Sequence, residues 1–227
     1  MTEYRDTEHT ESGESKEAET TVLYQNNGAK DGMLGEAQPN SLKPRGDKHF
    51  SYADYCSWDD DERWELIDGV AYAMSAPLVT HQRILRELFM PFGSFLRGKP
   101  CEVFVSPFDV RLGADEADDT VVQPDLLVVC DRTKLDDKGY KGTPDLIIEI
   151  LSPTTAGYDR LTKFNRYLRA GVKEYWMVDP DGRTVQVCLL RDDQYFTKAY
   201  GEGDTVPVDV LPGLEISLPD VFAEMQL

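Results

Sequence analysis

Two acidic residues interrupt two strongly apolar segments, and this pattern limits the folds that the chain can adopt. Asp125 opens the run LLVVC, and Glu149 stands inside LIIEIL. A carboxylate among branched aliphatic side chains loses its hydration shell, which costs several kcal/mol unless a cation or strong donors replace the water. A strand that served packing alone would carry Val or Ile at these positions. The pair therefore predicts buried strands that carry a site, although a single Glu of this kind is as often exposed or paired with an Arg.

The segments around these acids predict the strands of an α/β fold. The continuous apolar run of residues 144–151 predicts a strand that is buried on both faces. The dipeptide Asp68-Gly69 between alternating residues predicts a hairpin. Further strands are predicted over residues 101–106, 107–113 and 121–129 and in a meander over residues 174–200.

Two helices are predicted, one before and one after the central strands. The first covers residues 78–96, and we expect Pro91 and Gly93 to kink it or end it early. The second covers residues 158–170, is amphipathic, and is followed by Gly171, a residue suited to a C-cap. This order of elements predicts a mixed β-sheet flanked by helices.

Residues 1–48 differ in composition from the rest of the chain. They are rich in Glu, Thr, Ser, Gly and Asn and show no sustained apolar period. We therefore expect a disordered acidic tail over residues 1–48 and one folded domain over residues 49–227. Deletion of the tail should leave the fold intact, because the tail has too few large apolar residues to offset the entropy of ordering.

Composition and cysteine usage limit the class of protein. Hydrophobic residues make up 41% of the chain and aromatic residues 10%, as in globular proteins. Its four cysteines lie far apart and form no CxxC pair, which argues against a zinc site and a disulfide framework and favours a reducing compartment. No apolar run is long enough to span a bilayer, and the N-terminus is unlike a signal peptide. We therefore expect a cytoplasmic protein without a membrane partner.

The net charge of −18 argues against a nucleic-acid partner, because phosphates repel a negative surface. The distribution of charge weakens this objection. Residues 158–173 carry five basic side chains with Asp159 as their only acid, and residues 81–99 carry four with Glu87. Positive charge is therefore concentrated on the two predicted helices, although two solvated helix faces would give the same pattern.

Asp125 and Glu149 together predict a site for a divalent cation. If their strands are neighbours, both carboxylates reach one edge of the sheet, within about 6 Å of each other, and Mg²⁺ or Mn²⁺ suits oxygen ligands of this kind. Asp159, Lys163 and Tyr167 share one face of the following helix, at the edge of its apolar stripe. Lys163 could therefore point toward the carboxylates, and two carboxylates with one lysine suffice for metal-assisted phosphodiester hydrolysis.

At these residues the chain resembles the restriction-endonuclease-like PD-(D/E)XK superfamily, and within it the Uma-type family of endonucleases. The resemblance runs from about Tyr52 to Leu190 and includes WELIDG, the helix around His81, Pro124-Asp125, IEILSP and AGVKEYWMVDP. It implies a restriction-endonuclease-like fold and a magnesium-dependent endonuclease acting on DNA. A homodimer is compatible with it, but the sequence leaves the oligomeric state open.

The resemblance also assigns roles to residues. Asp125 and Glu149 correspond to the metal ligands, and Leu151 stands where the motif has its lysine. In this family the lysine has moved to the following helix, so the resemblance carries its catalytic role to Lys163. Glu65 corresponds to an acid that approaches the metal site, and an exposed hairpin Glu is the equally ordinary alternative.

Other candidates have simpler explanations. Asp145 lies four residues before Glu149 on the same strand, about 13 Å away, too far to share a magnesium ion, so we interpret it as strand entry. His81 could contact phosphate or assist proton transfer, but a lone His on an apolar helix is more often packed or exposed. Ser152 and Asp109 are weaker candidates, and Tyr167 is expected in the core rather than in catalysis.

Two functions are consistent with the sequence. The first is a magnesium-dependent DNA endonuclease, which Asp125, Glu149 and Lys163 favour, because a silent protein has no need to retain buried charges. The second is a catalytically silent interaction module on the same fold, which the net charge favours. The recognition sequence and the choice between DNA and RNA stay open.

Overall fold

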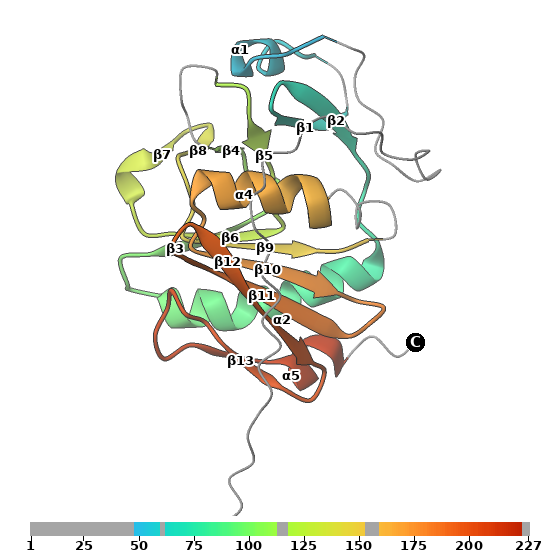
Figure 1. The fold of residues 1–227 in the computed structure, drawn as a ribbon, viewed down its shortest axis with the longest axis vertical. Coiled ribbons are helices and arrows are strands. Elements are labelled where there is room, and N and C mark those ends of the chain that lie inside the picture. The colour runs from blue at the N-terminus through green and yellow to red at the C-terminus, as the bar shows by residue number, and fades with distance from the viewer. Residues whose placement is uncertain (1–47, 60–61, 113–117, 153–158, 224–227) are drawn as a thin grey trace, which may run out of the picture.

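The computed structural model describes residues 48–59, 62–112, 118–152 and 159–223, without the side chains of residues 159 and 160. Strands form two six-stranded sheets, in the orders β2-β1-β5-β4-β8-β7 and β12-β11-β10-β9-β6-β3, and a separate ribbon of β13 and β14 (Figure 1). The sequence predicted one mixed sheet flanked by helices; the α/β class is confirmed, and the strands divide between two sheets. The predicted tail, apart from Lys48, lies outside the described residues.

The second sheet forms the centre of the molecule. Its strands are β3 (Glu102–Val105), β6 (Leu126–Val129), β9 (Leu146–Ile150), β10 (Glu174–Asp179), β11 (Thr184–Arg191) and β12 (Gln194–Gly201). Only β9 and β10 are parallel, whereas the other pairs are antiparallel. Because neighbouring parallel strands need a crossover, the chain between them forms η2 (Asp159–Lys163) and α4 (Phe164–Ala170). This crossover places Lys163 over the centre of the sheet.

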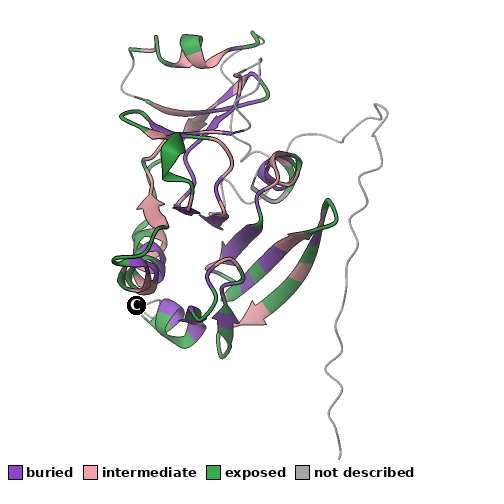
Figure 2. Ribbon diagram, turned by 90° about the vertical axis from the view of Figure 1, so that its left-hand side faces the viewer, coloured by how far each residue is buried: buried purple, intermediate pink, exposed green. Residues whose placement is uncertain are grey.

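The side chains of β9 alternate between two buried layers, so that both faces of the central sheet are covered, as predicted. Leu146, Ile148 and Ile150 pack in one core cluster with α2 (Val79–Leu96) and α5 (Leu218–Phe222). Ile147 and Leu151 pack in a second cluster, on the side of α4. In the outer hairpin of β11 and β12, by contrast, buried and exposed residues alternate along the strands (Figure 2). By alternation, Glu149 belongs to the α4 side.

The first sheet lies on the other side of α4 (Figure 1). It contains β1 (Arg63–Ile67), β2 (Val70–Met74), β4 (Val110–Arg111), β5 (Val121–Val122), β7 (Leu135–Asp136) and β8 (Gly139–Lys141), and it is capped by α1 (Tyr52–Tyr55). The predicted hairpin at Asp68-Gly69 joins β1 to β2, and both residues adopt positive φ. Ile67 joins the α4-side core, so Glu65, two residues earlier on β1, faces the same way.

Helix α2 agrees with the predicted helix over residues 78–96; of the two effects expected of Pro91, an early end is wrong and a kink stays a prediction. It continues to Leu96, and its buried residues Leu88, Phe92 and Leu96 lie on both sides of the proline. Burial of this apolar stripe against the central sheet offsets the lost hydrogen bond, which tertiary packing commonly does to local propensity. The remaining elements agree better, since α4 ends at Gly171 in the left-handed conformation that was predicted.

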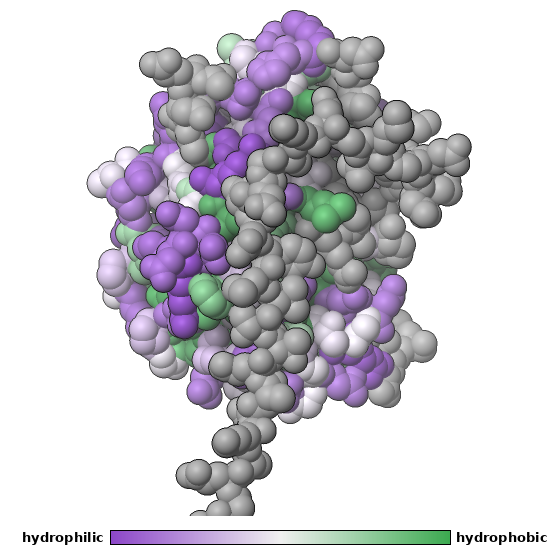
Figure 3. All heavy atoms as spheres, viewed as in Figure 1, coloured by the Kyte–Doolittle hydropathy of each residue, from purple (hydrophilic) through white to green (hydrophobic). Residues whose placement is uncertain are grey.

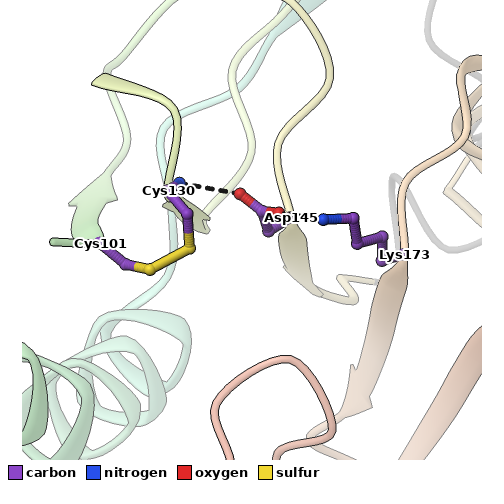
Figure 4. The surroundings of a disulfide bond; sticks show 4 residues. All are labelled: Cys101, Cys130, Asp145 and Lys173. Atoms are coloured by element: carbon purple, nitrogen blue, oxygen red, sulfur yellow. Dashed lines mark hydrogen bonds and ion pairs between the residues drawn. A yellow bond between two sulfur atoms is a disulfide. The ribbon is translucent and has the colours of Figure 1, made fainter. Parts of the chain in front are cut away.

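A disulfide joins Cys101 to Cys130, which contradicts the expectation of no disulfide (Figure 4). The last pair of the β3–β6 ladder is Glu102 with Val129, so the two cysteines occupy the next facing positions, with Cα atoms 4.0 Å apart. Facing residues of antiparallel strands come close enough for such a bond. Sequence spacing could not show it, because it depends on strand register. Cys56 and Cys188 are free, as expected.

The visible surface is mostly hydrophilic. On the face drawn in Figure 3, hydrophilic residues predominate among the described atoms, and hydrophobic residues occur in small groups between them. Among the described residues, no helix is both long enough and apolar enough to cross a membrane.

Candidate active site

Asp125 and Glu149 occupy facing positions on neighbouring strands. Strands β6 and β9 pair antiparallel, and Leu126 faces Ile148 at the end of the ladder, so the next facing pair is Asp125 and Glu149. The Asp125 carboxylate also reaches β9 directly, because its Oδ2 accepts the amide hydrogen of Ile150 at 2.7 Å. The expected adjacency of the two strands is therefore present. The expected separation of about 6 Å between the carboxylates stays a prediction.

Glu149 is a buried carboxylate held by two donors from the crossover. Its side chain is 4% exposed, and its Oε1 lies 2.8 Å from Lys163 Nζ. The same oxygen accepts a hydrogen bond from the Tyr167 hydroxyl at 2.7 Å. Burial, reinforced by the negative charge of Glu149, raises the pKa of Tyr167 well above its ordinary value, so the phenol stays protonated and acts as a donor. Tyr167 is thus a core residue, as predicted, and also a partner of the site.

Glu65 joins the same cluster from the other sheet. Its Oε1 lies 3.0 Å from Lys163 Nζ, and both side chains are almost fully buried. The backbone N–H of Gln123 donates to the same oxygen at 2.7 Å. The alternative of an exposed hairpin Glu is therefore wrong for this residue. Lys163 bridges Glu65 of one sheet and Glu149 of the other.

Lys163 lies where the helical geometry of the crossover changes. Lys163 is the last residue of η2, a π-helical turn that leads into α4. Such turns are rare and occur often at functional sites. Leu151, which stands where the motif has its lysine, is 5% exposed and packs in the core. The sequence expected the Lys163 ammonium near the carboxylates of Asp125 and Glu149. It lies within 4 Å of Glu149 and also of Glu65, whereas its proximity to Asp125 stays a prediction. Its role in catalysis stays a prediction.

His81 contacts the other candidate ligand. Its Nε2 lies 3.1 Å from Asp125 Oδ2, and the two side chains are 13% and 15% exposed. His81 is therefore mostly buried, in agreement with the packed alternative, and it also contacts a candidate metal ligand. Its place three residues into α2 brings the start of that helix to the start of β6.

The donor set suits a hard cation with few protein ligands. The described part of the chain contains no group of three His, Cys, Asp or Glu side chains arranged to hold a metal ion. Mg²⁺ typically uses one or two carboxylates and completes its shell with waters and phosphate oxygens. Asp125 and Glu149 are the two carboxylates that would hold such a cation.

The other sequence candidates lie apart from this cluster. The Asp145 carboxylate accepts the amide hydrogen of Cys130 and pairs with Lys173 at 2.7 Å, so it supports the start of β9, as interpreted (Figure 4). Asp109 accepts hydrogen bonds from Tyr55 and the Gln123 side chain, and burial raises its pKa. The side chain of Asp159 lies outside the described residues, and the role of Ser152, two residues after β9, stays a prediction.

The basic residues of the second helix are largely neutralised within the protein. Arg166 is 8% exposed and donates to Thr120 Oγ1 and to the carbonyl oxygen of Leu112. Arg169 is paired with Asp68, a residue that also faces Arg166. The guanidinium of Arg166 is therefore buried rather than part of a solvated helix face. Sequence periodicity placed it on the polar side, but the first sheet covers that side of α4.

Gln123 is a residue of the site that the sequence analysis did not single out. It is 7% exposed, its backbone amide holds Glu65, and its side-chain oxygen accepts from Arg63. Its position, directly before Pro124-Asp125, was the available signal. A polar residue that follows two valines and precedes a candidate metal ligand is costly to bury without partners.

A family comparison decides where the chain belongs. The family described as "Uma2: Putative restriction endonuclease" matches residues 52–219, about three quarters of the chain. The chain belongs to the Uma2 family. The resemblance inferred from the sequence is thus confirmed, and the matched residues include every member of the cluster.

Individual relatives extend this comparison. The Uma2 chain is 28% identical over 147 residues to "Uncharacterized protein slr1290" of Synechocystis sp., covering 63% of this chain and 76% of the relative. It is 28% identical over 137 residues to "Uncharacterized protein sll1609" of the same organism, covering 58% and 76%. A crystal structure from Anabaena variabilis, described as "a putative nuclease belonging to DUF820", superposes with a TM-score of 0.64 at 22% identity, covering 77% of this chain and 98% of that one. This last similarity confirms the fold.

Proposed function

We propose that this Uma2 protein is a metal-dependent endonuclease that hydrolyses DNA phosphodiester bonds. One observation carries the proposal: the Asp125 carboxylate accepts the amide hydrogen of Ile150, next to Glu149 on β9, and the Lys163 ammonium lies 2.8 Å from Glu149. Two carboxylates and a lysine are the elements that metal-assisted phosphodiester hydrolysis requires. Membership of a family described as restriction endonucleases supports the same reaction class.

Formal charge also supports a divalent cation. Asp125, Glu149 and Glu65 contribute three negative charges, and Lys163 contributes one positive charge. A divalent cation would balance this group, and burying carboxylates without such compensation is costly. When bound, Mg²⁺ or Mn²⁺ would supply an activated water and offset charge on the phosphate.

The protein's own residues then have distinct tasks. Tyr167 and the Gln123 amide hold Glu149 and Glu65 by hydrogen bonds of 2.7 Å each, which limits rotation of both carboxylates. Lys163, already placed between them, supplies positive charge that can act on a phosphate as negative charge develops on it. Both carboxylates are fixed by the protein, so little reorganisation is needed during the reaction.

The test is cleavage of supercoiled plasmid DNA by the full chain. We expect nicking or linearisation with Mg²⁺ or Mn²⁺ and none with EDTA. Asp125→Asn and Glu149→Gln should each lower the single-turnover rate by about a hundredfold or more, as removal of a preorganised group does. Circular dichroism at the assay temperature checks that each variant is folded.

Glu174→Gln is the matched control for Glu149→Gln. Glu174 is a fully buried Glu on the adjacent strand β10, where it binds Trp176 Nε1 and the amide of Val210 away from the cluster. This folded variant should cleave at the parent rate. Cleavage by Asp125→Asn at the parent rate, or equal losses in Glu174→Gln and Glu149→Gln, would overturn the assignment of the site.

A silent interaction module on the nuclease fold is the second candidate, and the pairing of the basic helix favours it. Arg166 and Arg169 are engaged by Asp68 and by the protein interior, so they offer little charge to a phosphate backbone. The net charge of −18 points the same way. A folded parent protein that cleaves neither DNA nor RNA with Mg²⁺ or Mn²⁺ would favour the module.

A further inference from the structure

His81 stands at a position where helix packing alone would place an apolar residue. It lies in the first turn of α2 and precedes Ile84 and Leu85 by three and four residues, so it shares their core-facing side. Ile84 and Leu85 are 0% and 7% exposed, and they anchor this turn in the core. The imidazole is therefore held by a rigid element, which is the requirement for a residue that positions another.

The contacts of His81 are concentrated on one carboxylate oxygen. Its Nε2 lies 3.1 Å from Asp125 Oδ2, which also accepts the Ile150 amide hydrogen at 2.7 Å. Because a carboxylate accepts and does not donate, Nε2 carries the hydrogen of this contact. The other ring nitrogen, Nδ1, is buried and has no hydrogen-bond partner among the described residues.

We propose that His81 is a positioning residue that fixes the Asp125 carboxylate for metal binding, an inference that rests on the proposed function. A single bond from Ile150 would leave the carboxylate free to turn about its own axis. His81 on α2 is a second donor to the same carboxylate, and its hydrogen bond removes that freedom. Both donors act on Oδ2, so Oδ1 is the atom that this arrangement presents to a cation.

The expected contribution of His81 to metal affinity can be estimated from other metal sites. Groups that hydrogen-bond to a ligand and fix its orientation contribute about 10–100-fold to metal affinity or activity. The contact here is between two side chains that are both mostly buried, so solvent does not replace the lost donor easily. His81 therefore acts through Asp125 and need not touch the substrate.

Side-chain geometry separates this role from simple packing. Gln can place an N–H near the position of Nε2, whereas Asn reaches only the position of Nδ1, which has no described partner. His49→Ala is the matched control, because His49 forms a similar pair with Asp119 at 3.3 Å but is 68% exposed and belongs to another part of the fold.

In the experiment, Mn²⁺ is titrated into the full chain. The dissociation constant of the complex is measured by calorimetry or from the electron paramagnetic resonance spectrum of free Mn²⁺. We expect His81→Ala and His81→Asn to raise the dissociation constant by about 10–100-fold. His81→Gln should lie within a few-fold of the parent, and His49→Ala should equal it. Thermal melts without metal check that the variants are folded.

Each outcome decides the proposal. If Asp125→Asn abolishes binding but His81→Ala binds Mn²⁺ as the parent does, His81 has no positioning role and the proposed metal site stands. The same conclusion follows if His81→Gln binds as weakly as His81→Ala. If the folded parent binds no Mn²⁺, both the proposed function and the role of His81 fail.

Discussion

Replacement of Lys163 should lower the stability of the fold strongly, because its side chain is buried. The residue is 3% exposed and lies between two buried carboxylates. Removing one member of such a group leaves charge buried without a partner, at a cost of about 3–5 kcal/mol. Urea unfolding of Lys163→Ala should show this loss.

Lys173→Ala provides the comparison. Lys173 also pairs with an Asp, at 2.7 Å, but its side chain is 67% exposed, so its loss should cost at most about 1 kcal/mol. Excess Mg²⁺ should stabilise Lys163→Ala more than the parent, because the remaining carboxylates gain a cation. Equal stability of the two alanine variants would show that Lys163 is not held as described.

Some residues of the site were accessible from the sequence and others were not. Asp125 and Glu149 could be found because an acid inside an apolar run is costly in any strand arrangement. The bridge from Lys163 to Glu65 could not, because it depends on how the first sheet packs over α4. His81 was undervalued for a similar reason, since its partner lies on a strand 44 residues further along the chain.

The disulfide that links strands β3 and β6 allows the contribution of this strand pair to stability to be tested. The disulfide between Cys101 and Cys130 closes a loop with a sequence separation of 29 residues. Loop-closure entropy for a loop of this length corresponds to about 3–4 kcal/mol, although measured disulfides range from about 0 to 5. Reduction with dithiothreitol, or Cys101→Ser, should lower the free energy of unfolding by an amount in this range.

Cys56→Ser controls for the chemistry of the substitution, since Cys56 is free and exposed. It should unfold at the parent urea concentration and lose stability on reduction as the parent does. An unfolding midpoint that is the same with and without reductant in the parent would mean that this bond does not form in solution.

The helices show why local sequence patterns predict the positions of helices better than they predict what packs against them. Apolar spacing found α2 and α4, and Gly171 marked the end of α4. Helix α2 continues beyond Pro91 because Leu88, Phe92 and Leu96 pack it against the core. The polar side of α4 was assigned to solvent because a periodicity cannot reveal a second sheet that covers it.

The protein as a whole should bind DNA with a weak dependence on salt. A binding constant falls with salt by a logarithmic slope of about 0.9 for each phosphate that a basic residue neutralises. Arg166 is buried and Arg169 is paired within the protein, so few cations of the second helix remain for phosphates. We expect a slope shallower than about −3 in fluorescence anisotropy with Ca²⁺ in place of Mg²⁺.

Arg166→Ala should lower stability and leave the slope of DNA binding against salt unaltered. Its guanidinium donates to Thr120 and to the Leu112 carbonyl inside the protein. A slope steeper than about −6 in the parent, reduced by about 1 in Arg166→Ala, would restore a phosphate contact for this residue.

The bridge of Glu65, Lys163 and Glu149 has a consequence for how sequences of this family drift. Because Lys163 joins the two sheets, Glu65, Lys163 and Glu149 support the fold as well as any reaction. A silent protein would therefore also have reason to retain these buried charges, contrary to the expectation from the sequence, and their presence in a relative does not distinguish an active enzyme from a silent module. Asp125, directly before β6, and His81 of α2 take no part in this bridge, and Asn or Ser in place of Asp125 could also accept the Ile150 amide hydrogen. Those two positions are where a silent descendant would first show substitutions.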